Sequence, residues 1–208
     1  MHIDLWGPYR TPSLSGAKYF LTIVDDKSRV TWTHLLHNKQ TVHKVLADFI
    51  AYASTQFHKQ IKVFRSDNGG EFISQACHEL FAKHGIIHQK TVPGNPQQNG
   101  RVERKHRHLL ETARALRIHA HLPIKFWGDC ILSATYLINM LPSSVLDWKS
   151  PYEVLMGKKP DYASLRVIGC LCYPLLKTTD KMEPRSARCI LIGYPYGTKG
   201  YKLYNLQT

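Results

Sequence analysis

Apolar and polar positions follow two different periods along the N-terminal half of the chain. Two runs rich in β-branched and aromatic residues, 19–24 and 30–36, flank the polar turn DDKSR and predict a β-hairpin. The segment HIDLWGP before them predicts a short strand that ends at Gly7-Pro8. Apolar residues at helical spacing over 42–53 then predict a helix that follows three strands.

Strand, turn and helix alternate in the middle of the chain. Residues 61–64 predict a short strand ended by the polar turn SDNGG, and the segment SQACHELFAKHG predicts a helix that stops at Gly85. The segment IIHQKTV predicts another short strand. A loop rich in Pro, Gly, Asn and Gln leads into a basic helix over about 100–118, with Asn99 or Gly100 as its N-cap.

The C-terminal half predicts a further helix and a second, smaller unit. The segment PIKFWGDCILSATYLINML predicts a helix opened by Pro123, and its apolar character all round indicates burial against another surface. Composition then shifts to Pro, Ser and Lys, which indicates a linker with one short helix at 151–156, and three short β-runs follow. We expect an α/β core over 1–142, a linker over 143–164 and a small β-module over 165–208.

Composition changes this picture mainly through charge. The chain has 28 Lys and Arg against 15 Asp and Glu, a formal net charge of +13, which favours a polyanionic partner such as nucleic acid. Its five cysteines contain no Cys-x-x-Cys pair, so neither a disulfide framework nor a zinc knuckle is indicated. No apolar run approaches the roughly 20 residues that cross a bilayer, so we expect no membrane association.

Three carboxylates stand where the predicted fold could bring them together. Asp4 lies in the first strand, Asp67 directly after the fourth, and Glu103 in the first turn of the basic helix. Residues at the ends of neighbouring strands converge at the edge of an open α/β sheet, and the basic helix could lie across them. Oxygen ligands, with no Cys and no His at metal spacing, favour Mg²⁺ or Mn²⁺ over Zn²⁺. Two such ions could serve an in-line phosphoryl displacement.

The basic helix also carries candidate contacts for phosphate groups. Arg107 lies one turn beyond Glu103 on the same helix face, and Arg114 continues that face. Arg104 and Lys105 flank it. We therefore predict that these four cations bind DNA, while a solvated helix face is the ordinary alternative.

Each of the three acids has an ordinary structural explanation as well. Asp4 could be an edge residue of its strand, and Asp67 could do no more than open the turn SDNGG. Glu103 could complement the positive end of the helix dipole, which is worth roughly 0.3–1 kcal/mol. The sequence pattern by itself leaves these alternatives open.

Three other acids lie close to the candidates along the chain. Asp25 and Asp26 compete with Asp4 for a place in the cluster, but they fall in the predicted hairpin turn. Glu71 follows Asp67 by four residues, and we expect it to face solvent at the start of its helix.

Seven blocks of the sequence, in order, resemble the integrase of a copia-type long-terminal-repeat retrotransposon. They are DLWGP, YFLTIVDDKSR, SDNGGEF, TVPGNPQQNGRVERK, FWGDCILSATYLIN, SPYEVLMGKKP and LIGYPYGTKGYKLYNL. The resemblance implies an RNase H-like mixed sheet flanked by helices, with an acidic triad on Asp4, Asp67 and Glu103 and 35 residues between the last two. It further implies binding of two divalent ions and DNA strand transfer, in which a 3′-hydroxyl of the element's cDNA attacks a phosphodiester of target DNA.

The resemblance extends to features around the core. The loop Asn95–Gly100 resembles the mobile loop beside the triad of retroviral integrases. The tail from about Arg166 resembles the SH3-like module that follows the core, which is expected to contact DNA or another subunit. The implied partners are cDNA ends, target DNA and further copies of the chain, and the implied site of action is the nucleus, after a cytoplasmic particle stage.

The sequence also departs from a full integrase of this family. The N-terminal His/Cys zinc-binding region and a following reverse transcriptase have no counterpart in it, and it begins three residues before Asp4, so the central strand could be shortened. We expect a piece of a polyprotein, or a decayed or host-adopted copy. An RNase H-type nuclease and an inactive DNA-binding or oligomerisation module are the alternative functions.

Overall fold

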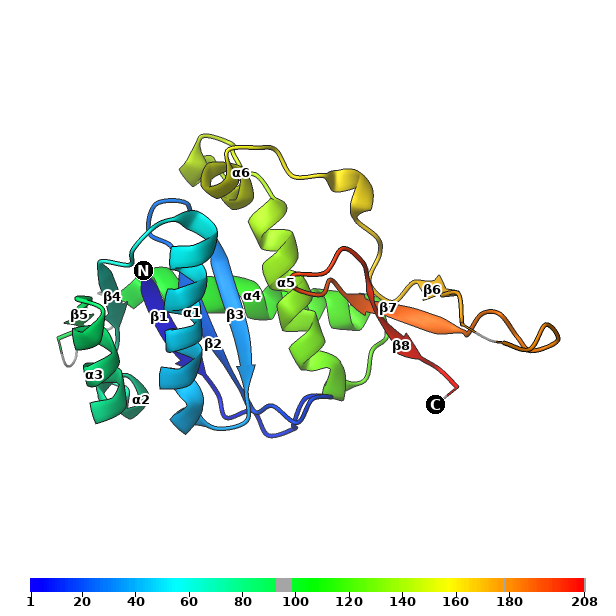
Figure 1. Ribbon diagram of the computed structural model, residues 1–208, viewed down its shortest axis with the longest axis horizontal. Helices are drawn as coiled ribbons and strands as arrows, with labels where there is room; N and C mark the ends of the chain where they lie inside the picture. Colours follow the sequence, from blue (N-terminus) through cyan, green and yellow to red (C-terminus); the bar gives the residue numbers. More distant parts are fainter. Residues whose placement is uncertain (93–98, 178, 208) are drawn as a thin grey trace.

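A computed structural model describes residues 1–92, 99–177 and 179–207 of the chain (Figure 1). The strands are β1 (His2–Trp6), β2 (Tyr19–Val24), β3 (Thr31–Leu36), β4 (Val63–Ser66), β5 (Ile87–Lys90), β6 (Leu171–Cys172), β7 (Cys189–Gly193) and β8 (Lys202–Asn205). The α-helices are α1 (Val42–Phe57), α2 (Gly70–Ile73), α3 (Gln75–Lys83), α4 (Gly100–His119), α5 (Trp127–Met140) and α6 (Pro151–Met156). Short 3₁₀ turns are η1 (Lys39–Thr41), η3 (Ile124–Phe126), η4 (Ser144–Leu146) and η5 (Tyr162–Ser164).

The first five strands form one mixed sheet with the order β3-β2-β1-β4-β5. β1 lies at its centre and pairs antiparallel with β2, where Asp4 stands opposite Thr22. On its other side β1 runs parallel to β4, with His2 beside Arg65. β4 and β5 are parallel, and β2 and β3 form the predicted antiparallel hairpin. The central strand, which we expected to be shortened, is therefore paired on both sides.

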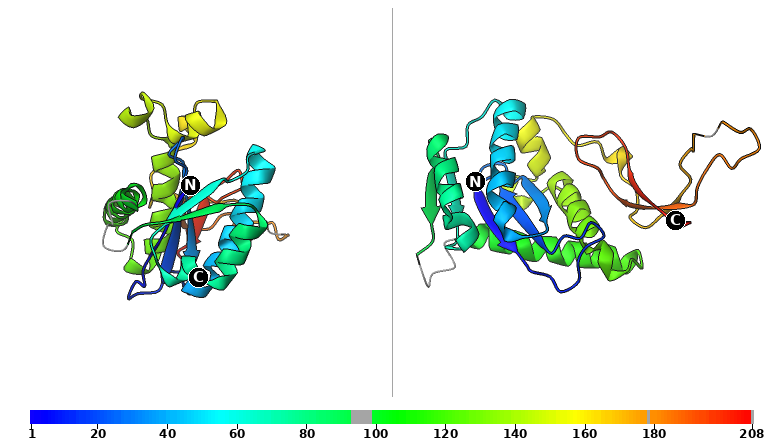
Figure 2. Two further views of the ribbon diagram at one scale, coloured as in Figure 1. Left: turned by 90° about the vertical axis from the view of Figure 1, so that its left-hand side faces the viewer. Right: turned by 60° about the horizontal axis from the view of Figure 1, so that its bottom comes forward.

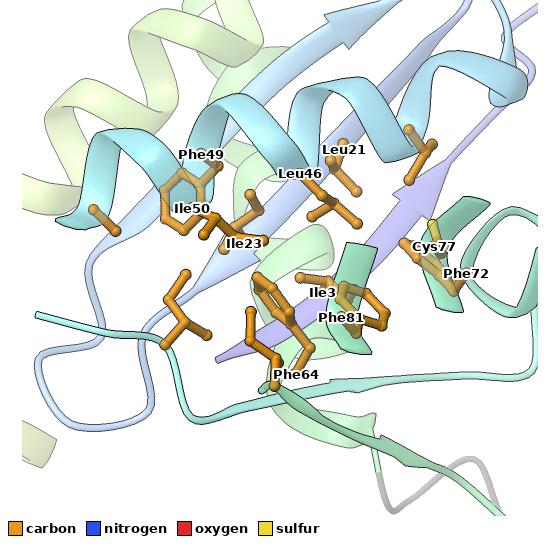
Figure 3. Close-up of a cluster of buried hydrophobic side chains, with 14 of the residues drawn as sticks. Ile3, Leu21, Ile23, Leu46, Phe49, Ile50, Phe64, Phe72, Cys77 and Phe81 are labelled. Carbon is orange, nitrogen blue, oxygen red and sulfur yellow. The ribbon is translucent and has the colours of Figure 1, made fainter. Parts of the chain in front are cut away.

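One face of the sheet packs against α1, α2 and α3 through an apolar cluster (Figure 3). Ile3, Leu21 and Ile23 point to this face, because successive residues of a strand alternate between faces. They meet Leu46 of α1 and Phe64 of β4, and all five side chains are fully buried. Burying each such side chain stabilises the fold by about 1.5–3 kcal/mol. This cluster is the main apolar core of the sheet.

The opposite face is covered by α4 and α5 (Figure 2). Phe20 of β2 points to this side and packs in a second cluster with Leu109 of α4 and Ile131 of α5. The Trp6 ring stacks on Phe20 at 5.0 Å between centroids. Most of α5 is buried, which confirms the burial predicted from its apolar sequence.

The three C-terminal strands form a separate small sheet with the order β6-β7-β8, docked on α5. The hydroxyl of Ser133 donates a hydrogen bond to the Ile192 carbonyl at 3.2 Å, and the Tyr136 and Tyr194 rings stack at 4.3 Å. β6 is only two residues long, because most of the apolar run around it is irregular. All five cysteines are free thiols. Within the described ranges, no helix has the length and apolar character needed to cross a bilayer.

Candidate active site

Asp4 lies in the middle of the central strand and faces the α4 side of the sheet. Its neighbour Ile3 faces the opposite apolar core, so strand alternation directs Asp4 toward α4. The side chain is 17% exposed. Its Oδ1 accepts a hydrogen bond from the Leu5 amide at 2.9 Å, and its Oδ2 lies 3.3 Å from Nδ1 of His106. Asp4 is therefore a partly buried carboxylate with one oxygen in a hydrogen bond and the other in contact with a histidine ring.

The other two predicted acids act on Asp4 electrostatically. Burial raises the pKa of Asp4 to about 6, and the negative charges of Asp67 and Glu103 contribute to the increase. Asp67 directly follows β4 and is exposed, and its Oδ1 accepts a hydrogen bond from the Gly69 amide at 2.9 Å. Glu103 is exposed in the first turn of α4. The fold thus brings Asp67 and Glu103 close enough to the central strand for their charges to act on Asp4.

In their present side-chain conformations, the three acids are not arranged to hold a metal ion. Within the described part of the chain, no group of three or more His, Cys, Asp or Glu side chains has the arrangement of a metal site. Asp4 is held by its hydrogen bond with the Leu5 amide, whereas Asp67 and Glu103 are exposed and have other rotamers available to them. Closing the site therefore requires these two side chains to turn toward Asp4.

The chemistry of the site nevertheless fits a divalent cation. Carboxylate oxygens are the ligands that Mg²⁺ and Mn²⁺ prefer, and a cation would offset both the burial of the Asp4 charge and the repulsion from neighbouring acids, which together raise the pKa of Asp4. Polar atoms also remain buried near Asp4 without a hydrogen-bond partner among the described residues: Thr22 Oγ1, Asn99 Oδ1 and His106 Nε2. Thr22 is the direct cross-strand neighbour of Asp4. Such unpaired groups are typical of a functional site rather than of a finished core.

Glu71 does not face solvent, so that prediction is wrong. Its side chain is only 9% exposed, and its Oε1 lies 3.5 Å from Nζ of Lys39. Its charge also contributes to the raised pKa of Asp4. The physical reason is that α2 packs against α1, which turns the first turn of α2 inward. Glu71 is therefore a fourth acid of this region.

Our sequence analysis did not identify His106 as a residue of this site. It lies three residues after Glu103 and is buried on the inner side of α4, with its ring edge-on to Phe20 at 5.2 Å. Burial lowers the pKa of His106 to about 4, so the ring is neutral near pH 7 and its 3.3 Å contact with Asp4 is not an ion pair. Its i,i+3 spacing from Glu103 indicates a neighbouring position on the helix surface but not which side of α4 turns toward the sheet.

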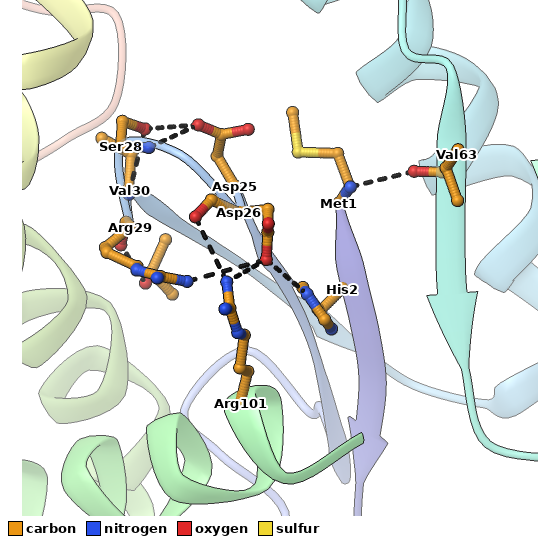
Figure 4. Close-up of polar contacts among 10 residues, drawn as sticks. Met1, His2, Asp25, Asp26, Ser28, Arg29, Val30, Val63 and Arg101 are labelled. Atoms are coloured by element: carbon orange, nitrogen blue, oxygen red, sulfur yellow. Dashed lines mark hydrogen bonds and ion pairs between the residues drawn. The ribbon is translucent and has the colours of Figure 1, made fainter. Parts of the chain in front are cut away.

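Asp26 ties the start of α4 to the hairpin turn instead of joining the acids (Figure 4). Its Oδ1 contacts Nη1 of Arg101 in the first turn of α4, and it lies 2.8 Å from Nε2 of His2. Nη1 of Arg29 adds a second cationic contact at 3.6 Å. Asp25 accepts hydrogen bonds within the same turn. Both aspartates thus have the turn roles expected for them.

Three of the four predicted DNA-contacting cations are open to solvent. Arg104, Arg107 and Arg114 are exposed along α4. Lys105 is half-buried, and burial, followed by the neighbouring charge of Arg29, lowers its pKa. The exposed arginines run along the helix that begins beside the acids.

The predicted loop Asn95–Gly100 lies largely outside the described residues, which resume at Asn99. Asn99 is the N-cap and α4 begins at Gly100, which confirms the predicted start of this helix. Asn99 is buried, and its side-chain amide donates to the Ile3 carbonyl at 3.4 Å. The first turn of α4 is therefore held directly against the central strand.

A cavity of about 900 Å³ lies elsewhere, between the free side of β3, the helices α5 and α6, and the turn after β7. Aromatic side chains such as Trp32, Tyr52 and Tyr136 line it, whereas the three predicted acids do not. The acidic site is instead at the surface, since two of its acids are exposed. An open site beside a basic helix suits an extended polymer better than an enclosed small molecule.

Comparisons with known proteins identify both units of the chain. The integrase core domain matches residues 1–96, and the retroviral polymerase SH3-like domain matches residues 170–208. The chain is 39% identical over 207 residues to the Retrovirus-related Pol polyprotein from transposon TNT 1-94 of Nicotiana tabacum, covering 99% of the chain and 16% of that protein. It is 38% identical over 212 residues to the corresponding polyprotein from transposon RE1 of Arabidopsis thaliana, covering 100% and 14%. The chain thus spans less than a fifth of these relatives.

Solved structures share the fold at low sequence identity. The catalytic core domain of BIV integrase gives a TM-score of 0.53 at 20% identity, covering 75% of this chain and 92% of that one. A simian T-cell lymphotropic virus intasome in complex with the PP2A regulatory subunit B56 gamma gives 0.59 at 15% identity, covering 98% and 74%. The predicted RNase H-like mixed sheet with a small SH3-like β-module is confirmed, as is the resemblance to copia-type Pol polyproteins. The domain limits at 142 and 165 stay a prediction.

Proposed function

Because residues 1–96 match the integrase core domain and the whole chain is 38–39% identical to parts of two retrotransposon Pol polyproteins, we propose that it catalyses divalent-metal-dependent DNA strand transfer. The reaction would insert element cDNA into target DNA. One phosphodiester of the target breaks while a 3′-hydroxyl of the cDNA forms a new one, so the number of phosphodiesters is conserved. The observation that carries this proposal is Asp4, a partly buried carboxylate beside a basic helix, whose pKa is raised by burial and by the acids around it.

Asp4, Asp67 and Glu103 are the residues that would hold two Mg²⁺ or Mn²⁺ ions. Asp4 supplies a carboxylate in the middle of the central strand, and the other two supply exposed carboxylates whose charges act on it. When bound, such ions activate the attacking hydroxyl oxygen and stabilise the leaving oxygen. The contribution of the chain is to hold three anionic groups close together in spite of their repulsion.

The exposed arginines of α4 would bind the DNA backbone. Arg104, Arg107 and Arg114 present positive charge along one helix, and Lys105 lies between them in a half-buried position. Contacts with phosphate release counterions, so DNA binding should weaken steeply as salt concentration increases. Replacing Arg107 by Gln should reduce the slope of log K against log salt by about one. A flat salt response would remove the phosphate-contact role.

The proposal includes the assembly and location of the reaction. Both ends of a linear cDNA must be joined to the target, so we propose that two or more copies of the chain act together. The solved relative with the same fold over 98% of this chain is named as an intasome, which supports assembly on DNA. Action in the nucleus, after a cytoplasmic particle stage, follows from the proposed target.

A joining assay tests the proposed activity directly. The chain is incubated with labelled DNA ends, target duplex and Mg²⁺, and joined products are counted. Glu103→Gln should abolish joining while leaving DNA binding largely intact, because it removes one carboxylate beside Asp4. Glu111→Gln, on the exposed side of the same helix, is the matched control and should join normally. Joining by the Glu103 variant at the wild-type rate would show that the triad is misassigned.

The same assay separates two other functions. An RNA–DNA hybrid is offered in parallel, since an RNase H-type nuclease on this fold would cleave the RNA strand and leave the DNA ends unjoined. A chain that binds DNA but neither joins nor nicks it, even with Mn²⁺, would be a binding or oligomerisation module. Either result would replace strand transfer as the function.

A further inference from the structure

His106 and Asp4 form a direct contact between the two elements that carry the proposed metal-binding acids. Asp4 is on β1, and His106 is on α4, three residues after Glu103. The Oδ2 of Asp4 lies 3.3 Å from Nδ1 of His106, and the histidine side chain is only 9% exposed. A hydrogen bond here would fix the position of α4 relative to the central strand.

The two ring nitrogens of His106 have different surroundings. A neutral imidazole carries one N–H, so one nitrogen donates and the other accepts. Nε2 is buried and has no hydrogen-bond partner among the described residues, so a proton there would be buried without an acceptor. A proton on Nδ1 has the Asp4 carboxylate as its nearest acceptor, with Oδ2 at 3.3 Å from the nitrogen. The surroundings therefore favour the form of the ring that donates from Nδ1.

The two oxygens of Asp4 face two different donors. Oδ1 accepts from the Leu5 amide, which belongs to the same strand, and Oδ2 lies 3.3 Å from Nδ1 of His106 on α4, within reach of a hydrogen bond once the ring N–H points at it. Each carboxylate oxygen has two lone pairs, so one remains free on each oxygen for a further partner. The ring of His106 is kept in place by its edge-on contact with Phe20 at 5.2 Å.

We propose that His106 is a positioning residue for the metal-binding carboxylate of Asp4, an inference that rests on the proposed function. It donates a hydrogen bond from Nδ1 to Oδ2 and thereby fixes the rotamer of Asp4. The same contact fixes the position of α4, which carries Glu103, relative to Asp4 on β1. Hydrogen-bond partners that orient a metal ligand without touching the ion are important for binding. Their removal lowers metal affinity by about 10–100-fold.

Three substitutions distinguish this role from simple packing. His106→Phe keeps the ring and its contact with Phe20 but removes the donor. His106→Asn puts an amide nitrogen the same number of bonds from the backbone as Nδ1, whereas His106→Gln puts it one bond farther, as Nε2 is. His108→Phe, on the exposed side of α4, is the matched control. Mn²⁺ affinity is measured by calorimetry, the folded state by thermal unfolding, and kcat and KM by the joining assay.

The Phe and Gln variants should stay folded, bind Mn²⁺ about 10–100-fold more weakly and lose kcat by a similar factor, with KM for DNA unchanged. The Asn variant should recover most of the affinity, and the His108 variant should behave as wild type. Nitrogen NMR of the wild-type histidine rings should place the His106 proton on Nδ1, a measurement that needs no variant.

Any one of three results would overturn the role of His106 alone. The first is wild-type Mn²⁺ affinity in the Phe variant, and the second is equal Mn²⁺ affinity in the Asn and Gln variants. The third is an NMR signal that places the ring proton on Nε2. Should the wild-type chain bind no Mn²⁺ and join no DNA, the proposed function fails and the positioning role fails with it. The two failures are therefore distinguishable.

Discussion

The two faces of the central sheet are built from alternate residues of the same strands, yet they serve different ends. On the α1 face, Ile3, Leu21 and Ile23 are fully buried in a cluster of apolar side chains. On the α4 face, the same strands present Asp4 and Thr22, and buried polar atoms there have no partner among the described residues. The first face stabilises the fold, whereas the second holds charge at a cost in stability, as proposed active sites commonly do.

The largest expected effect is on the apolar face. Phe64→Ala removes a fully buried ring from that cluster and should lower the free energy of unfolding by about 3–5 kcal/mol, measured by urea denaturation. Ile73→Ala is the control, because Ile73 is 48% exposed and should cost little. A loss below about 1 kcal/mol for Phe64 would mean that this face is not the main source of stability.

On the α4 face, removing a charge should increase the free energy of unfolding rather than lower it. The pKa of Asp4 is raised to about 6, so its ionised form destabilises the folded state, and this cost develops as pH rises from about 4 to about 6. Asp4→Asn should therefore increase the free energy of unfolding above pH 6 by up to roughly 2 kcal/mol, and change it little near pH 4. Denaturation at pH 4 and pH 7.5, with exposed Asp48→Asn as control, measures this.

A less stable Asp4→Asn chain at pH 7.5 would show that Asp4 acts as an ordinary structural hydrogen-bond acceptor. The contrast between the two faces would then be lost.

Metal addition should sharpen the contrast further. Mg²⁺ at ten times its dissociation constant should stabilise the wild-type chain by about 1.4 kcal/mol, because it binds the folded state and offsets the repulsion at Asp4. The same Mg²⁺ concentration should leave the stability of Asp4→Asn nearly unchanged. Thermal unfolding with and without Mg²⁺ provides the measurement, and equal stabilisation of both chains would place the ion elsewhere.

The smallest effect concerns the ion pairs that hold the start of α4. Asp26→Asn weakens the contacts with Arg101 and Arg29, and exposed pairs of this kind contribute less than about 1 kcal/mol. Overall stability should change little, while amide hydrogen exchange in the first turn of α4 should become faster. Unchanged exchange at residues 100–104 would show that Asn99 alone holds this end of the helix.

Local periodicity was enough to predict most elements of the sheet. The strands Tyr19–Val24 and Thr31–Leu36, the start of α4 at Gly100 and the burial of α5 follow from patterns within short stretches of sequence. The two-residue β6 was not predicted, because its long apolar run is mostly irregular in a small module. In that module, packing against α5 decides the backbone more than β-propensity does.

The site was predictable only in its acids, and only in part. Asp4, Asp67 and Glu103 could be chosen from the strand ends and from the resemblance to integrases. Glu71 and His106 could not, since their orientation depends on which faces of α2 and α4 turn toward the sheet. That information lies in packing between elements far apart in the sequence, and no local pattern carries it.

The most direct test of the central claim is anomalous diffraction from crystals of the chain soaked in Mn²⁺. We predict anomalous peaks between Asp4, Asp67 and Glu103, with the exposed side chains of the last two turned toward Asp4. Crystals of Glu103→Gln should lose at least one peak. Two results would contradict metal binding by these three acids. One is well-ordered carboxylates with no anomalous peak between them, and the other is a peak that lies only beside other residues.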